Sequence, residues 1–161
     1  GMSQRGGAVQ SHLRISEDPI ASDLIPMGSC DMILSVEPME ALRYLPFLAA
    51  DGWVVTSSKT FDNIDDYPDE EKIFSEIRKI RNHVILDAYS MARELGSQKV
   101  SNMVMLGAAS RMLGLDMKQL SGALNMLFGR KGEEVVQLNV RALEAGNQAV
   151  STRNNKVQRA L

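Results

Sequence analysis

Cysteine is almost absent from this sequence. Cys30 is the single cysteine in the chain, so no disulfide can form within it, and a reducing compartment is its natural setting. An iron–sulfur cluster normally requires four thiolates, which one cysteine cannot supply. The two histidines, His12 and His83, lie far apart and have no partners at zinc-ligand spacing. We therefore predict no metal site in this chain and a structural role for Cys30.

Long apolar runs and a strong charge of either sign are also missing. The longest apolar stretches are only a few residues, whereas a membrane span needs about 20, and no signal-like segment opens the sequence. The net charge is −2, and nucleic-acid binders usually carry a basic face. These absences argue against membrane and nucleic-acid functions and favour a cytoplasmic protein. The 161 residues, 44% of them hydrophobic, suffice for one domain with a sizeable core.

Short apolar runs alternate with amphipathic segments in the first two thirds of the chain. Strands are predicted at residues 8–16, 31–36, 53–56 and 84–86, the first with a bulge near Ser11. Helices are expected between them: one opened by Glu37 and Pro38 and continuing to Phe47, one after Pro68 carrying Ile73, Ile77 and Ile80, and one that ends at Leu95 before Gly96. Strands that alternate with helices indicate a mainly parallel sheet.

From Ser101 onward the pattern is entirely helical. Helices are predicted at about 101–113, 116–128 and 132–149, with Asp116 and Ser101 as candidate N-caps. Residues 150–161 form a polar tail that we expect to fray or to pack against a partner. The predicted fold class is α/β, a three-layer α/β/α arrangement with a mainly parallel or mixed sheet and a helical C-terminal part.

A loop of small residues opens the sequence and is the best candidate for a binding site. Ser3, Gln4, Arg5, Gly6 and Gly7 combine a fixed positive charge with two adjacent glycines. Successive amides in such a turn can form a concavity for an anion, and the guanidinium fork suits phosphate or carboxylate. The alternative is an ordinary tight turn with a solvated arginine.

Four further residues, in three places, could contribute to a site. Glu37 follows a predicted strand, at the edge where open α/β sheets bind ligands, although a carboxylate there could also simply stabilise the helix dipole. Asn102, after Ser101, begins an apolar helix whose N-terminal amides could bind an anion, unless this is only a capped core helix. Arg130 and Lys131, between two helices, could contact a phosphate or complement the preceding helix C-terminus. No nucleophile–base pair or paired carboxylates emerge, so we assign no catalytic residue.

Several segments together resemble a known family. They are Gly1-Met-Ser-Gln-Arg-Gly-Gly7 continuing through Val9, Ser11-His12 and Arg14-Ile15; Ser22 to Pro26; Asp31 to Pro46; Ser101 to Ala108; and Arg130-Lys131-Gly132. In these the chain is similar to the gamma-type domain of the 2-oxoacid:ferredoxin oxidoreductases, and most of all to the smaller (beta) subunit of the indolepyruvate-type enzymes. The resemblance covers residues 1–149. Family members carry a strand, a glycine-rich turn and a helix before the first of these segments; none is present here, so the resemblance implies a chain truncated at its start.

The resemblance implies a role as the subunit that carries no cofactor of its own. In this family a larger partner subunit is expected to hold thiamine pyrophosphate and the iron–sulfur clusters. The implied reaction is oxidative decarboxylation of an aryl pyruvate such as indolepyruvate, with coenzyme A as acyl acceptor and ferredoxin as electron acceptor. Two alternatives remain open: a gamma subunit for another oxoacid (pyruvate, 2-oxoglutarate or a branched-chain acid), and a stand-alone module that binds acyl-CoA or a nucleotide.

Overall fold

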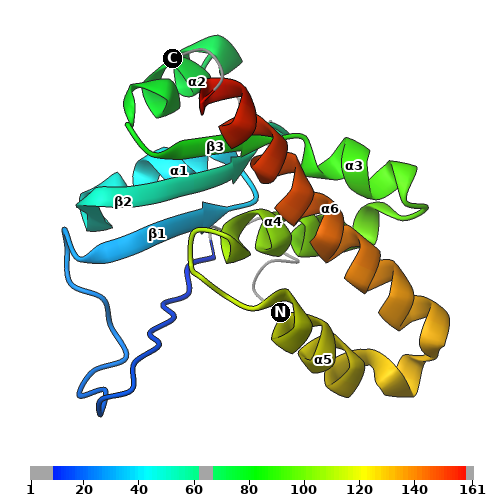
Figure 1. Ribbon diagram of the computed structural model, residues 1–161. Helices are drawn as coiled ribbons and strands as arrows, with labels where there is room; N and C mark the ends of the chain where they lie inside the picture. The colour runs from blue at the N-terminus through cyan, green and yellow to red at the C-terminus, as the bar shows by residue number, and fades with distance from the viewer. Residues whose placement is uncertain (1–8, 62–66, 159–161) are drawn as a thin grey trace.

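The structure, a computed structural model, describes residues 9–61 and 67–158, with side chains up to Ser151. These residues form three strands, six α-helices and three 3-10 helices, which are called η here; Figure 1 labels the strands and the α-helices. In chain order the elements are β1 Cys30–Ser35, α1 Pro38–Arg43, η2 Leu45–Phe47, β2 Leu48–Ser57, α2 Glu70–Lys79, β3 His83–Leu86, α3 Ala88–Glu94, η3 Gln98–Val100, α4 Ser101–Ser110, α5 Met117–Phe128, η4 Gly129–Lys131 and α6 Glu133–Gln158.

The strands form a parallel sheet in the order β1-β2-β3. Leu34 of β1 pairs with Val55 of β2, which pairs in turn with Val84 of β3. Parallel neighbours require crossover connections, which α1 and α2 provide. The predicted α/β class, with a parallel sheet and a helical C-terminal part, is confirmed.

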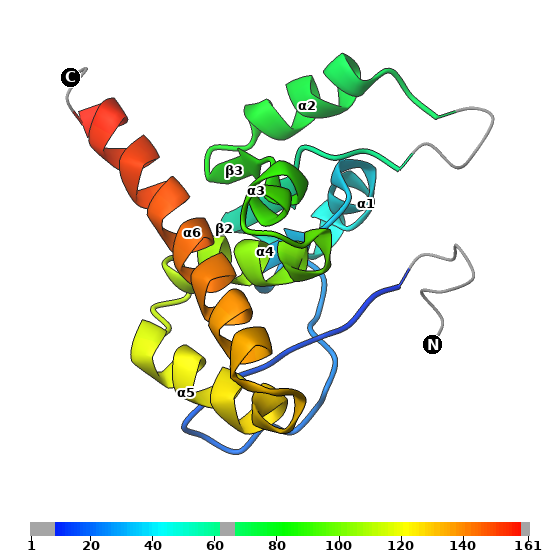
Figure 2. The ribbon, with the colours of Figure 1, turned by 90° about the vertical axis from the view of Figure 1, so that its right-hand side faces the viewer.

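Helices cover both faces of the sheet, as the packing of two adjacent residues of β2 shows. Successive side chains of a strand point to opposite faces. Val54 packs with residues of α1 and α2, whereas Val55 packs with residues of α3, α4 and α6. Both valines are fully buried, so the sheet is the middle of three layers (Figure 2).

The sheet face on which Val55 lies is covered by α4, and α6 packs on α4. The central part of α4 is buried on nearly all sides, including Val104, Met105 and Ala108. The long helix α6 crosses α4, and η4 joins the end of α5 to the start of α6 (Figure 1). None of the helices in the part of the chain that the structure describes is long and apolar enough to cross a membrane.

One predicted strand does not form. Residues 9–16 have no strand conformation and pair with no neighbouring strand. Their alternation has no buried face to occupy, since Leu13 and Ile15 are 73% and 72% exposed. A strand needs both a ladder partner and a covered face, and the periodicity of residues 8–16 predicted neither.

Other elements start or end differently from the prediction. The first helix ends at Arg43 because Leu45 precedes Pro46, and a residue before proline disfavours the α conformation. β2 begins at Leu48, five residues early, and includes a buried Gly52 at which a Cβ would lie 2.8 Å from the carbonyl oxygen of Cys30. The absence of a side chain lets β1 approach here, where its register shifts.

In the helical part, Asp116 caps α5 as predicted, accepting a hydrogen bond from the Lys118 amide at 2.9 Å. Ser101 was wrongly expected as a cap, because η3 runs directly into α4 and leaves Val100 at the cap position. α4 ends at Ser110 rather than 113, and Gly114 follows with a φ of 64°. α6 continues to Gln158 instead of stopping at 149, since Val150 still packs in the core.

Candidate functional site

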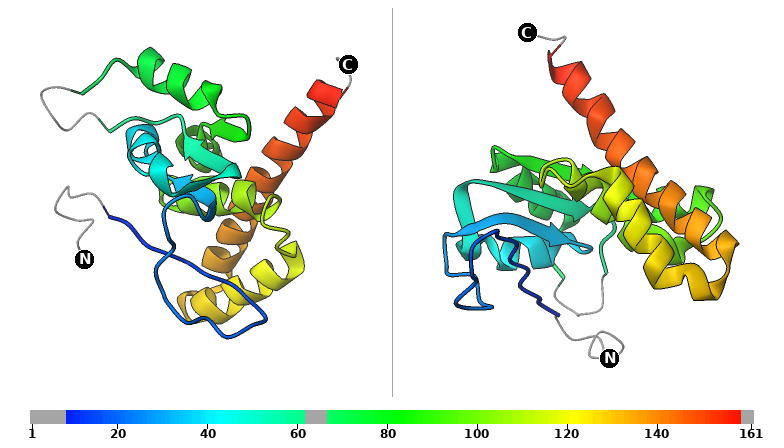
Figure 3. Two further views of the ribbon diagram at one scale, coloured as in Figure 1. Left: turned by 90° about the vertical axis from the view of Figure 1, so that its left-hand side faces the viewer. Right: turned by 60° about the horizontal axis from the view of Figure 1, so that its bottom comes forward.

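An extended arm, residues 9–29, leads into the free edge of β1 (Figures 1 and 3). His12 links two parts of the arm, because its Nδ1 accepts a hydrogen bond from the Ile25 amide at 2.9 Å. Arg14 adds a second link, donating to the Ser22 carbonyl at 2.7 Å. The His12 ring also meets Phe47 edge-on, with the ring centroids 5.7 Å apart. The His12–Phe47 ring contact and a backbone hydrogen bond from the Gly28 amide to the Pro46 carbonyl at 2.9 Å therefore attach the arm to the region after α1, and no strand ladder does so in the described residues.

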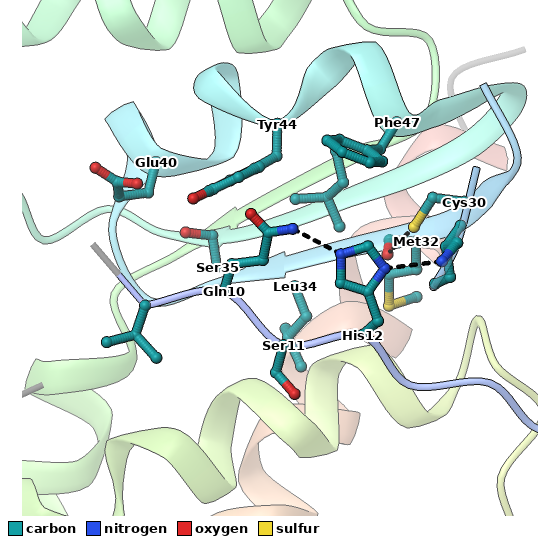
Figure 4. Close-up of a pocket in the computed structure, with 13 residues that line it drawn as sticks. Gln10, Ser11, His12, Cys30, Met32, Leu34, Ser35, Glu40, Tyr44 and Phe47 are labelled. Atoms are coloured by element: carbon teal, nitrogen blue, oxygen red, sulfur yellow. Dashed lines mark hydrogen bonds between the residues drawn. The ribbon is translucent and has the colours of Figure 1, made fainter. Parts of the chain in front are cut away.

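A cavity of about 150 Å³ lies between the start of this arm and β1 (Figure 4). Its walls come from the arm, from β1 and from the α1–η2 region. The lining residues are Val9, Gln10, Ser11, His12, Ile25, Cys30, Met32, Ile33, Leu34, Ser35, Glu40, Tyr44 and Phe47. An apolar engineered cavity of this size accommodates benzene. The space thus suits a small, flat, largely apolar group.

Glu40 supplies an unusual polar group in this lining. Its Oε2 atom is buried and accepts no hydrogen bond from the described residues, while its Oε1 lies 3.4 Å from an Arg43 guanidinium nitrogen. In Figure 4 the carboxylate lies at the same end of the cavity as Ser35 and the Tyr44 hydroxyl. An unpaired buried acceptor can receive a hydrogen bond from a ligand. The sequence analysis selected Glu37 and not Glu40 as a candidate site residue, because the burial of one carboxylate oxygen has no signature in the sequence.

Among the described residues, the lining of the cavity contains no nucleophile and base arranged for nucleophilic catalysis. The thiol of Cys30 donates to the Met32 carbonyl oxygen at 2.8 Å. Nδ1 of His12 accepts from Ile25, and its Nε2 lies 2.6 Å from the Gln10 amide nitrogen. A nucleophile would need a base within hydrogen-bonding reach. The arrangement can bind a group but offers no activated nucleophile.

Glu37 lies at the carboxyl end of β1, as predicted, and is 9% exposed. Its Oε2 accepts from the Glu40 amide at 2.8 Å and caps α1. Its Oε1 accepts a hydrogen bond from the Tyr67 hydroxyl, which arrives from the segment before α2. Both oxygens are thus engaged within the chain. Tyr67 was missed in the sequence because 30 positions separate it from Glu37, and no local pattern links two such residues.

Asn102, the second residue of α4, is exposed. The preceding 3-10 turn uses one of the amides that a free helix N-terminus would offer, since Ser101 donates to the Gln98 carbonyl. Asn102 and Glu37 share no hydrogen bond. The structure therefore does not join these two predicted site residues.

Asp87 occupies the carboxyl end of β3 and caps α3. Its carboxylate accepts a hydrogen bond from the Ser90 amide at 2.9 Å. That bond, the Ser90 hydroxyl, and the charges of Arg93 and Lys59 lower the pKa of Asp87 below 3.8, against a smaller opposing effect of burial. The carboxylate stays ionised, and its contacts are those of a helix cap.

Arg130 and Lys131 lie on η4 between α5 and α6, as expected, and both are exposed. The Lys131 ammonium lies 5.3 Å from the centroid of the Phe128 ring. No group of three or more acidic, histidine or cysteine side chains gathers in residues 9–61 and 67–151 at metal-binding distance. The predicted loop Ser3, Gln4, Arg5, Gly6 and Gly7 lies outside the described residues.

Comparison with known proteins extends across the whole chain. The family profile described as pyruvate ferredoxin/flavodoxin oxidoreductase matches residues 1–149. The chain is 33% identical over 175 aligned positions to indolepyruvate oxidoreductase subunit IorB of Archaeoglobus fulgidus, covering 98% of this chain and 81% of that protein. The proteins of the same name from Thermococcus kodakarensis and Pyrococcus horikoshii are 33% and 31% identical, each over 92% of this chain and 77% of the relative.

These matches confirm the resemblance seen in the sequence motifs. They include the opening loop, β1 and the helical C-terminal part within one continuous match. At this identity and coverage the relationship applies to the fold as a whole. The chain belongs to the pyruvate ferredoxin/flavodoxin oxidoreductase family.

Proposed function

We propose that this chain is the smaller subunit of an indolepyruvate oxidoreductase. The observation that carries the proposal is the match to IorB subunits over nearly the entire chain. The reaction is oxidative decarboxylation of an aryl pyruvate. The bond between the carboxylate and the carbonyl carbon breaks, carbon dioxide leaves, the acyl group forms a thioester with coenzyme A, and two electrons pass to ferredoxin with release of the thiol proton.

The larger subunit carries thiamine pyrophosphate and the iron–sulfur clusters in this proposal. The single cysteine of this chain supports that division, because it cannot provide four thiolates for a cluster. The thiamine cofactor supplies the carbanion chemistry, and the clusters carry the electrons away. This chain contributes to binding and to closing the site, and it assembles in the cytoplasm.

Within this division, the loop Ser3, Gln4, Arg5, Gly6 and Gly7 faces the cofactor pocket of the partner. Arg5 meets an anion there, either the carboxylate of the oxoacid or a phosphate of coenzyme A. Its guanidinium can bind either group through two parallel hydrogen bonds. Asn102 is a further candidate for ligand contact, because it is exposed at the start of α4. Glu37 acts as a positioning residue, since both its oxygens bind groups of this chain.

The test is a steady-state assay of the reconstituted two-subunit enzyme, following ferredoxin reduction driven by indolepyruvate. Arg5→Ala should lower kcat/KM by about 10- to 100-fold, the loss expected for a charged hydrogen bond of about 1.5–3 kcal/mol. Arg5→Lys should recover part of the lost kcat/KM, because lysine keeps the positive charge but cannot form two parallel hydrogen bonds. A higher KM for indolepyruvate alone identifies the carboxylate, and a higher KM for coenzyme A alone identifies the phosphate.

Lys72→Ala on α2 is the matched control, since Lys72 is an exposed cation outside the motif. The role of Arg5 is wrong if both its variants keep wild-type turnover and both KM values. A panel of pyruvate, 2-oxoglutarate and a branched-chain oxoacid tests the substrate class separately. Turnover of one of these in clear preference to indolepyruvate would replace the aryl assignment while leaving the subunit role intact.

A further inference from the structure

The cavity between the arm and β1 has no part in the proposed function, although its lining is suited to a ligand. Its volume is about 150 Å³, a size at which an apolar cavity holds one benzene ring. Val9 and Leu34 in its lining are 52% and 42% exposed. A ligand can therefore enter from solvent, and the part of it that does not fit can remain outside.

Aromatic rings contribute much of the lining. The rings of His12 and Phe47 meet edge-on, and the Tyr44 ring centroid lies 6.3 Å from that of Phe47 at an interplanar angle of 49°. All three side chains line the cavity (Figure 4). Aromatic rings pack favourably on one another in edge-to-face and offset geometries. This lining thus favours a planar aromatic ligand over a branched aliphatic one.

Glu40 requires a hydrogen-bond donor from outside the described residues. Its Oε2 atom is buried and unpaired, whereas Arg43 already provides positive charge 3.4 Å from Oε1. The neighbouring Ser35 hydroxyl donates to the Glu37 carbonyl and is not available. The terminal torsion of a glutamate is soft, so the carboxylate can turn toward a ligand without a shift of α1. A neutral donor on the ligand would satisfy Oε2.

The same carboxylate excludes other kinds of ligand. A carboxylate or phosphate inserted beside Glu40 would place a second negative charge in partly buried surroundings, which is unfavourable. A metal ion would need several ligands, and the described residues contain no group of three or more acidic, histidine or cysteine side chains at metal-binding distance. A neutral ring that carries an N–H or O–H group meets both the apolar and the polar requirement.

We propose that this cavity binds a neutral, planar aromatic ring and that Oε2 of Glu40 accepts a hydrogen bond from a donor on that ring. The ring enters first, and any anionic group of the same molecule stays outside. Two sources have this chemistry: the aryl side chain of the oxoacid, and a free aromatic molecule such as indole. The first source rests on the proposed function, whereas the second does not.

Binding is tested by titrating the full chain with indole and recording amide NMR spectra. The shifts should concentrate at residues 10–12 of the arm and 32–35 of β1. Glu40→Leu should weaken the binding of indole at least about tenfold relative to benzothiophene, which has a similar shape but no donor. Leu34→Trp fills the cavity and should abolish the binding of both rings.

Glu94→Leu is the matched control. Glu94 is exposed on α3, whose Ala88 and Ala92 pack on the opposite face of the sheet from α1. This variant makes the same change of side chain away from the cavity. Its dissociation constants for indole and benzothiophene should be those of the wild type.

Turnover by the two-subunit enzyme separates the two sources. Phenylpyruvate has an aryl ring without a donor, so we compare its kcat/KM with that of indolepyruvate. An indolepyruvate-to-phenylpyruvate ratio that falls about tenfold in Glu40→Leu assigns the cavity to the ring of the substrate. A wild-type ratio, combined with weakened indole binding to the chain, assigns it to a separate aromatic ligand. An enzyme that turns over neither aryl pyruvate would contradict the proposed function but not the binding of indole by this chain.

Two results would overturn the inference. Indole raised to its solubility limit might shift amides only outside the cavity, or none at all, and the cavity would then bind no aromatic ring. Glu40→Leu could also leave the ratio of the indole and benzothiophene dissociation constants at its wild-type value. In that case Oε2 accepts no hydrogen bond from the ring.

Discussion

Gly107 of α4 and Gly146 of α6 lie where the two helices cross without room for a Cβ atom. A Cβ on Gly107 would lie 1.9 Å from the carbonyl oxygen of Leu143, and one on Gly146 would lie 1.9 Å from that of Val104. Both obstacles are backbone atoms, which cannot rotate away as a side chain can. The two glycines therefore set how closely α6 approaches α4, and so where α6 holds α5.

Substitution at this crossing should be strongly destabilising. Gly107→Ala and Gly146→Ala each force the helices apart, and we expect a loss of stability at or above the usual overpacking range of about 1–3 kcal/mol. Urea unfolding of the isolated chain measures it. Gly122→Ala in α5 is the control, because a Cβ there meets nothing within 4 Å; it should gain about 0.5–1 kcal/mol from better helix propensity. Equal stability of all three variants would refute the close contact.

Tyr67 should stabilise the fold through Glu37. Tyr67→Phe removes the hydroxyl that donates to Oε1 of that buried carboxylate. Leaving a buried charged acceptor short of a partner should cost about 1–3 kcal/mol, measured by urea unfolding. Tyr44→Phe is the matched control, since no hydrogen bond of the Tyr44 hydroxyl is found among the described residues, and it should change stability by less than about 0.5 kcal/mol. The reverse order of the two effects would contradict the assignment.

Asp87 should make stability depend on pH in the acid range. Its pKa is lowered in the folded state, first by the Ser90 amide and then by the Ser90 hydroxyl. A lowered folded-state pKa means that this contribution is complete above the unfolded value near 3.8 and is lost as pH falls through the folded value. Asp87→Asn keeps a capping acceptor but removes the charge.

Melting temperatures at a series of pH values from about 7 down to about 2.5 give the readout. The wild type should be more stable than Asp87→Asn at neutral pH, and the difference should shrink below the unfolded-state pKa. Ser90→Ala removes the hydroxyl, which is one of the groups that lower the pKa of Asp87, but keeps the amide donor. The melting temperature of Ser90→Ala should therefore lie between those of the wild type and Asp87→Asn across the pH series. A wild-type advantage that stays constant down to the lowest pH would disprove the linkage.

His12 should keep the arm in place. His12→Ala removes the hydrogen bond from the Ile25 amide and the edge-on contact with Phe47. Together these contribute about 1.5–2 kcal/mol, so the state in which the arm is detached should become about 10- to 30-fold more populated. Trypsin cleavage after the exposed Arg14 reports that population. His12→Asn retains an acceptor near the position of Nδ1 and should be cut at an intermediate rate; a rate unchanged in His12→Ala would show that the arm is held by other contacts.

Local patterns in the sequence were enough to predict most of the sheet and several helix boundaries. Val54 and Val55 belong to an apolar run typical of strands buried on both faces, and both are buried. Gly96 after α3 and Asp116 before α5 are positioned by bonds to residues only two or three positions away. Such signals are contained within a short stretch of chain, so they can be read before the fold is known. The opening motif, together with Asp31 to Pro46, likewise identified the family without coordinates.

The tertiary structure alone decided what the chain brings together across long separations. In the folded chain, residues 9–16 have no strand partner among the described residues, and Tyr67 donates a hydrogen bond to Glu37. One oxygen of Glu40 is buried beside the cavity, whereas Met126 is exposed. The alternation of residues 9–16 and the apolar character of Met126 are visible in the sequence, yet their meaning depends on whether another segment lies against them. Burial is a property of a residue and its neighbours in space, and the neighbours here come from elements that no local pattern connects.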